Sequence, residues 1–151
     1  MNGSAIIIQL DGNKPGGRQL DGGQLGRKAR VYQPGEILSG QYTVDSASPS
    51  DIGAVETSVL WYSEGKGDED LAVHEFWRKS TENGDFIDAR RPERFSTTLP
   101  QSPLSYDGRI IKIRWCVRVR AFVGRKEIVA EEPFQLGNVP SQEEEVGEET
   151  S

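Results

Sequence analysis

The sequence predicts an all-β protein, an antiparallel β-sandwich of about seven strands. Segments with alternating apolar and polar residues recur along the chain, and turn signals such as Pro34-Gly35 and Asn83-Gly84 separate them. Seventeen glycines and a hydrophobic content of 34% suit a fold with many turns, and no segment has a convincing helical period. At 151 residues the chain is long enough for one domain with its own core.

Four strands are predicted in the first half of the chain. Residues 4–10 are a short β-branched run, and strand formers surround the Pro34-Gly35 turn. Residues 54–64 place Val55, Val59 and Trp61 on the buried side. In residues 71–80, the alternation predicts that Leu71, Val73 and Trp77 are buried and that His74, Phe76 and Arg78 are exposed.

Three strands are predicted in the second half, over residues 94–99, 108–122 and 125–136. The middle one alternates most strictly, with Trp115, Val117 and Val119 among its apolar residues. Its other side carries Lys112, Arg114, Cys116, Arg118 and Arg120. We expect Trp61, Trp77 and Trp115 to fill the core between the two sheets, because each has the apolar parity of its strand.

Two segments are not expected to form regular structure. Residues 11–30 contain six glycines and predict a long loop. From residue 137 onward there is no apolar pattern, so we expect a sandwich over 1–136 and a disordered tail over 137–151. The tail contributes five glutamates to the net charge of −6, which leaves the body nearly neutral.

Composition argues against several functional classes. With one cysteine no internal disulfide can form, and a reducing, cytoplasmic location is the simpler expectation. His74 and Cys116 are the only histidine and cysteine, so no structural zinc site is expected, and no cofactor is predicted. No secretory signal or membrane span is predicted. We also considered a Cys116–His74 nucleophile pair, but both residues have exposed parities and lack a glycine elbow; no catalytic residue is predicted.

The strand predicted over residues 108–122 carries four cations on one side, which we call the basic stripe: Lys112, Arg114, Arg118 and Arg120. One interpretation pairs them across strands with Glu56, Glu64, Glu127, Glu131 and Glu132. A second makes the stripe a docking face for an acidic partner, joined by Arg90, Arg91 and Arg94 into one positive surface. A third docks the chain's own acidic tail there. Nucleic acid is not expected as a partner, because the body is nearly neutral.

Two stretches carry a resemblance to a known family. The first is Val31-Tyr32-Gln33-Pro34-Gly35-Glu36, with Leu38 and Gly40; the second is Phe95-Ser96-Thr97-Thr98-Leu99-Pro100, with Pro103, Leu104-Ser105-Tyr106 and Gly108. They resemble motifs of the arrestin N-terminal domain, whose superfamily includes the α-arrestins and a retromer subunit. The resemblance covers about residues 4–136 and implies an immunoglobulin-like, arrestin-type sandwich with an adaptor or scaffold role.

The chain departs from arrestins in ways that limit this resemblance. It has the length of a single sandwich, and Ala5 to Ile8 stand where arrestins have a lysine pair that senses receptor phosphate. Receptor binding is therefore not carried over.

The function predicted is a non-catalytic protein-interaction module. Its partner would bind the basic stripe, with Arg90 and Arg91, or an edge strand, which could also pair with a second copy of the chain. The alternative is a small-ligand or carbohydrate-binding module. It would present Tyr62, Phe76 and Tyr106 in one exposed row.

Overall fold

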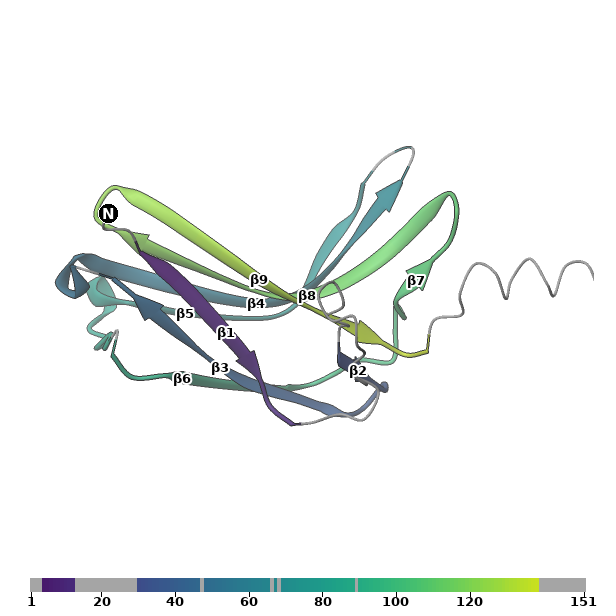
Figure 1. Ribbon diagram of the computed structural model, residues 1–151, viewed down its shortest axis with the longest axis horizontal. Coiled ribbons are helices and arrows are strands. Elements are labelled where there is room, and N and C mark those ends of the chain that lie inside the picture. Colours follow the sequence, from purple (N-terminus) through teal and green to yellow (C-terminus); the bar gives the residue numbers. More distant parts are fainter. Residues whose placement is uncertain are drawn as a thin grey trace, which may run out of the picture.

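The chain forms an all-β sandwich, as the sequence predicts (Figure 1). The fold is described from a computed structural model, which describes residues 4–12, 30–46, 48–65, 67, 69–88 and 90–138. The smaller sheet has the strand order β1-β3-β6 and is antiparallel throughout. Its strands are β1 (Ala5–Leu10), β3 (Ile37–Asp45) and β6 (Glu93–Thr98).

The larger sheet has the order β2-β9-β8-β4-β5, and β7 pairs with β8 beside this path. Its strands are β2 (Arg30–Tyr32), β4 (Ile52–Gly65), β5 (Leu71–Ser80), β7 (Tyr106–Asp107), β8 (Ile111–Val123) and β9 (Lys126–Leu136). Only the short β2 runs parallel to its neighbour β9 among the pairs described. Two 3-10 turns, Pro49–Asp51 and Thr81–Asn83, precede β4 and follow β5.

Strand β8 is the centre of the larger sheet, and its alternation builds the core. Trp115, Val117 and Val119 point toward the smaller sheet and are at most 1% exposed. Leu38 and Phe95 meet them from the smaller sheet. All three tryptophans contribute to the interior as predicted, because the partly buried Trp61 and Trp77 pack against this core. The other partly buried apolar residues that pack against it are Ile6, Ile8, Ile87, Val123 and Ile128.

The described residues form nine strands, more than the seven or so predicted. The strand formers between residues 30 and 45 belong to two strands, because the turn at Pro34-Gly35 sends β2 into the larger sheet and β3 into the smaller one. Gly35 has φ 88°, a left-handed conformation that glycine adopts without strain. Strand β7 has two residues, too few to show any alternation in the sequence.

The two stretches that resemble arrestin motifs meet at one end of the sandwich. The amide of Gly35 donates to the carbonyl of Leu99 at 3.0 Å, and the amide of Leu99 donates to the carbonyl of Glu36 at 2.9 Å. Next to them, the buried Trp115 donates its indole N–H to the carbonyl of Pro103 at 2.8 Å. The amide of Ser105 donates to the carbonyl of Leu136 at 2.8 Å. These bonds tie the ends of both sheets together.

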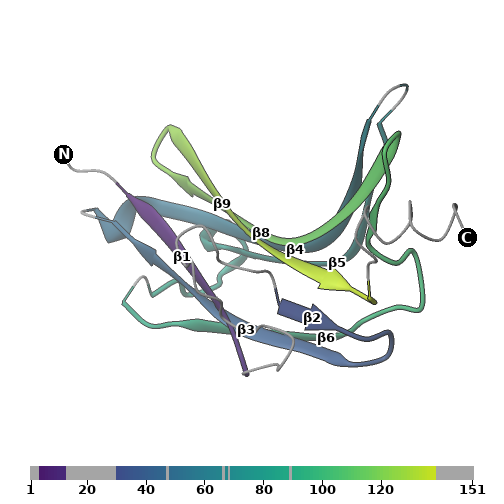
Figure 2. The ribbon, with the colours of Figure 1, turned by 45° about the vertical axis from the view of Figure 1, so that its right-hand side comes forward.

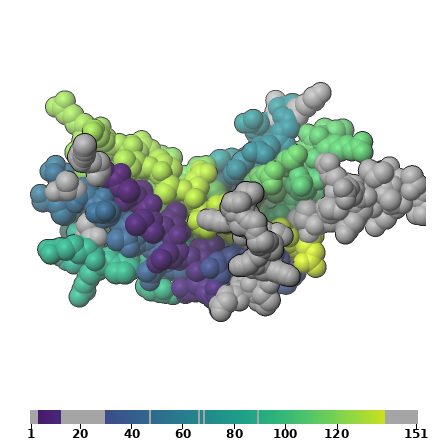
Figure 3. Space-filling model, in the orientation of Figure 1, coloured from purple at the N-terminus to yellow at the C-terminus, as the bar shows by residue number. Residues whose placement is uncertain are grey.

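The larger sheet is strongly curved, and its outer face is concave. In Figure 2 the ends of β4, β5 and β8 rise away from the smaller sheet, and the β8–β9 turn rises at the opposite end. The space-filling view shows the molecule hollowed between these two raised parts (Figure 3). The face of the larger sheet that turns away from the core is therefore a hollow and not a flat wall.

The predicted glycine-rich loop lies outside the described residues from 13 to 29, and so does the acidic tail from 139 to 151. The flanks of the loop are in contact, because the guanidinium of Arg30 donates to the carbonyl of Gly12. Strand β9 ends at Leu136, and the following Gly137 is buried, with its amide donating to Tyr32 at 2.8 Å.

Gly40 of β3 lies opposite Leu10 of β1 and Phe95 of β6, and it offers a test of this packing. A methyl group there would stand 2.5 Å from the carbonyl oxygen of Gln9 and 3.1 Å from the ring of Phe95. We expect Gly40→Ala to lower the free energy of unfolding by about 1–3 kcal/mol, since overpacking forces the backbone apart. Gly53→Ala is the control, because its nearest neighbour is 4.0 Å away. Urea denaturation followed by tryptophan fluorescence measures both, and equal effects would contradict the packing.

Candidate functional site

The floor of the concave outer face is apolar. In register, Val73 of β5 lies opposite Leu60 of β4, Leu60 opposite Cys116 of β8, and Cys116 opposite Pro133 of β9. Leu60 is 1% exposed and Cys116 is 3% exposed, yet neither belongs to the core between the sheets. A cavity of about 170 Å³ opens above Leu60, with Arg118 in its wall. The sheet therefore buries apolar side chains on both of its faces.

A β-bulge in β5 determines which side chains of that strand reach this hollow. Glu75 lies opposite Val59, but Val73 lies opposite Leu60, so His74 is an extra residue in the ladder. For this reason the predicted alternation of β5 is wrong from Leu71 to His74, and it is correct from Phe76 to Arg78. Leu71 and Val73, predicted to be buried, face the hollow together with Phe76, and His74, predicted to be exposed, faces the core. In the sequence, the only sign of this bulge is the adjacent polar pair His74-Glu75 inside an apolar run.

Leu71, Val73 and Phe76 form an exposed apolar ridge along this edge strand. Their exposed fractions are 53%, 49% and 49%. All three border the same cavity above Leu60. Large apolar side chains gathered on one exposed face mark an interaction site more often than single ones do. The apolar ridge is the feature that sequence reasoning missed.

Every cation of the basic stripe is paired with a carboxylate on a neighbouring strand. The pairs are Lys112 Nζ–Asp107 Oδ1 at 3.5 Å, Arg114 Nε–Glu64 Oε1 at 3.3 Å, Arg118 Nε–Glu131 Oε2 at 2.7 Å and Arg120 Nε–Glu127 Oε2 at 3.0 Å. Pairing with Glu64, Glu127 and Glu131 was one of the three interpretations of the stripe. The outer face is therefore a set of neutralised charges, and an acidic partner would compete with these carboxylates.

Two of the predicted acidic partners, Glu56 and Glu132, do not pair with the basic stripe in this way. Glu56 is on the outer face but pairs with Arg78 of β5. Glu132 lies opposite Val117, which points into the core, so it has the other parity of β9. A one-residue step along a strand moves a side chain to the opposite face, which is why neighbouring glutamates differ.

Of the three further arginines, Arg90, Arg91 and Arg94, the last does not extend the basic stripe. This residue lies on the outer face of the smaller sheet, where it pairs with Asp11. Arg90 and Arg91 lie in the exposed connection that leads into β6, and both contact Asp88. The predicted continuous positive surface is therefore wrong where it includes Arg94, because the stripe faces outward from the opposite sheet.

Cys116 and His74 lie on opposite faces of the larger sheet. The imidazole Nε2 of His74 lies 2.9 Å from the carbonyl oxygen of Thr98, and its ring meets Trp115 edge to face at 6.3 Å. Burial raises the pKa of the Cys116 thiol to about 12. The prediction that both residues are exposed is wrong, and the two side chains are not placed to act together as base and nucleophile.

The three aromatic residues considered for carbohydrate binding do not form one row. Tyr62 and Phe76 face the hollow side of the larger sheet. Tyr106 lies opposite Ile113, which has the parity of Trp115, and therefore belongs to the other face.

No family model matches the sequence, and no curated protein matches it either. Among the described residues, no group of three or more His, Cys, Asp or Glu side chains is placed to hold a metal ion. No helix in the described part of the chain is long and apolar enough to cross a membrane.

The pair Arg118–Glu131 offers a test of the stripe, because the Arg118 side chain is only 24% exposed. A double-mutant cycle with Arg118→Ala and Glu131→Ala should give a coupling free energy of about 0.2–1 kcal/mol in urea denaturation. The coupling should fall as salt is added, since screening weakens a half-exposed pair. A coupling of zero at low salt would show that the pair is not formed in solution.

The thiol of Cys116 should react slowly in the native protein. Its pKa of about 12 keeps it protonated, so labelling by iodoacetamide should stay slow between pH 7 and pH 9. The unfolded chain in urea should react faster over the same range, because an exposed thiol ionises near pH 8.5. A native labelling rate equal to that of the unfolded chain at the same pH would contradict the burial of this side chain.

Proposed function

We propose that this chain is a non-catalytic protein-interaction module that binds its partner in the hollow of the larger sheet. The observation that carries the proposal is the apolar ridge of Leu71, Val73 and Phe76, half exposed above the buried Leu60 and Cys116. Protein interfaces place such apolar anchors at the centre and polar groups around them. The ridge provides the anchors on a rigid strand.

The ion pairs of the basic stripe form a polar rim beside this ridge. Arg118 and Arg120 border the same cavity as Phe76 and are held by Glu131 and Glu127. Side chains held in this way keep their donors oriented and lose little freedom when a partner arrives. The stripe therefore contributes orientation and specificity, and the ridge contributes most of the affinity.

Binding through the outer face is better supported than pairing along the free edge of β5. A regular edge accepts an added strand through evenly spaced backbone groups. The bulge at His74 interrupts that spacing, and Arg78 and Lys79 place charges near the end of the strand. Bulges and charged residues are the usual protection of an edge strand against pairing, including pairing with a second copy.

The resemblance to the arrestin N-terminal domain supports an adaptor role. Its residues lie where the two sheets are tied together, around Gly35, Leu99 and Ser105. We propose a cytoplasmic location on the basis of the single cysteine. The alternative class, a small-ligand module, is favoured by a separate observation, the cleft between β5 and β6 that is described below.

Affinity capture from the native host tests the proposal, with partners quantified by mass spectrometry. The variant Val73→Asp/Phe76→Asp should lose a specific protein partner by about tenfold or more, because it places charges at the apolar anchors. Ile37→Asp is the matched control, since Ile37 is 63% exposed on the smaller sheet. Circular dichroism should show that both variants fold.

Two results would contradict the proposal. If Arg118→Glu/Arg120→Glu loses the partner and the ridge variant retains it, the cations and not the ridge are the anchor. If no variant changes capture and the protein binds a glycan panel, the chain is a ligand-binding module.

A further inference from the structure

A second hollow opens on the side of the sandwich where β5 and β6 are both edge strands. On the opposite side β1 lies close to β9, which closes the space between the sheets. Between β5 and β6 a cavity of about 490 Å³ reaches from the surface down to Val55 and Thr57 of β4. This volume falls in the range of small-molecule sites, about 300–1,000 Å³. We call this cavity the edge cleft.

Aromatic rings line the interior of the edge cleft. Trp77 of β5 and Phe95 of β6 pack against each other across it, with centroids 6.0 Å apart and planes at 39°. Tyr42 lies beside them and shares a hydrogen bond with Thr57. Burial raises the pKa of Tyr42 to about 12, so its phenol remains neutral at physiological pH. A ligand inside the cleft would meet the rings of Tyr42, Trp77 and Phe95, with Phe76 at its border, and no buried charge.

Contacts between β5 and β6 keep the edge cleft in shape. Beyond Trp77 toward the bulge, His74 Nε2 lies 2.9 Å from the Thr98 carbonyl oxygen, and Thr97 donates to Glu75 at 3.3 Å. On the other side of Trp77, Lys79 Nζ and Glu93 Oε2 are 2.8 Å apart. Lys79 and Glu93 both line the cleft, so this ion pair places an ammonium group beside the aromatic interior.

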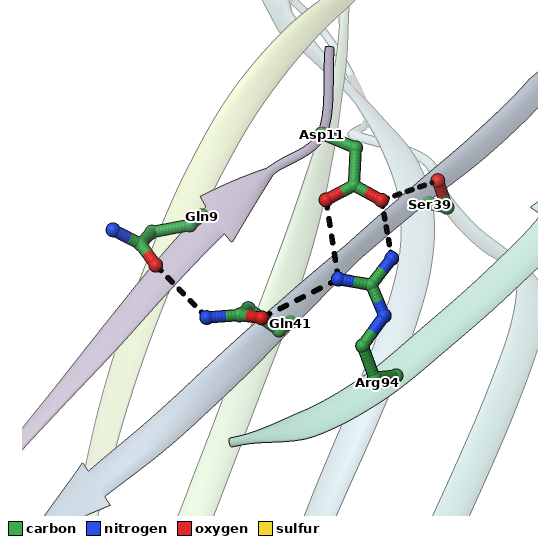
Figure 4. A network of polar contacts seen from close by, with 5 residues as sticks. All are labelled: Gln9, Asp11, Ser39, Gln41 and Arg94. Carbon is green, nitrogen blue, oxygen red and sulfur yellow. Dashed lines mark hydrogen bonds and ion pairs between the residues drawn. The ribbon is translucent and has the colours of Figure 1, made fainter.

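Ion pairs neutralise all but one of the five charged residues that line the edge cleft. The guanidinium of Arg94 turns away to Asp11, which also accepts from Ser39, as Figure 4 shows. Arg78 is likewise engaged by Glu56, and neither Asp11 nor Glu56 lines the cleft. Asp85 lines it and accepts from the amide of Ser80 at 2.9 Å, but makes no ion pair with another described residue.

We infer that the edge cleft binds a small organic cation, a molecule with an ammonium or quaternary ammonium group beside an apolar body. Aromatic faces attract such cations, and desolvation strengthens that attraction. Glu93 already pairs with the ammonium group of Lys79 there, and Asp85 supplies a carboxylate that makes no ion pair with another described residue. An anionic ligand would meet the carboxylate of Asp85, while Lys79, Arg78 and Arg94 are each paired with an acid.

This site is separate from the protein-binding hollow, since the two open on different sides of β5. Phe76 borders both cavities, so it is not varied in this test. Failure of the cation site would leave the proposed function untouched, because that function rests on the apolar ridge in the hollow and is tested by protein capture, not by cation binding.

The test is a titration of ¹⁵N-labelled full-length protein with benzyltrimethylammonium, followed by NMR. We expect a saturable shift of the Trp77 indole signal, assigned with Trp77→Phe. Asp85→Asn should raise the Kd about fivefold, since it removes a charge but retains an acceptor for the Ser80 amide. Asp51→Asn, an equal change of charge at an exposed residue outside the cleft, should leave the Kd unchanged.

A second comparison uses the wild-type protein and two uncharged or anionic analogues of the ligand. Benzyl alcohol and phenylacetate have the same ring without the positive charge, and both should bind at least about fivefold more weakly than the cation. Equal binding of either compound, or no saturable shift at Trp77, would overturn the inference. A short trimethyllysine peptide tests the source of the cation: tighter binding than the free compound would identify a side chain, and weaker binding a small molecule.

Discussion

The extra residue at His74 determines which side chains each face of β5 presents to its surroundings. Because the bulge shifts the alternation by one position, Leu71 and Val73 face the outer hollow together with Phe76. The same shift turns His74 inward toward Trp115 and Thr98, next to Trp77 at the edge cleft. One irregularity in a ladder of hydrogen bonds thus builds the apolar ridge on one face and holds the edge cleft on the other.

The larger sheet can support such sites because its central strand is held on both sides. Strand β8 pairs with β4 along its whole length and with β9 from Trp115 to Val123, and its inward side chains between Trp115 and Ala121 are buried. Its outward ion pairs add little free energy each, about 0.2–1 kcal/mol, but their opposite charges keep the strands in register. Stability comes from the buried face, which leaves the outer face free to carry binding groups.

Individual strands were predictable to different degrees. The outward and inward residues of β4 and β8 follow strict alternation, so Val59, Trp115 and Arg118 lie where the pattern places them. The pattern failed at β5, because two-residue periodicity cannot register an inserted residue. It also failed to bury Cys116, which has an outward parity but sits at the bottom of a curved sheet.

The sequence by itself determined the all-β class, the three core tryptophans and most strand positions, because these depend on local alternation and turn residues. Which carboxylate pairs with which cation depended on the register between strands far apart in the chain. The hollow and the edge cleft were decided only by tertiary structure, since sheet curvature and the meeting of β5 with β6 involve strands whose relative position no local pattern specifies.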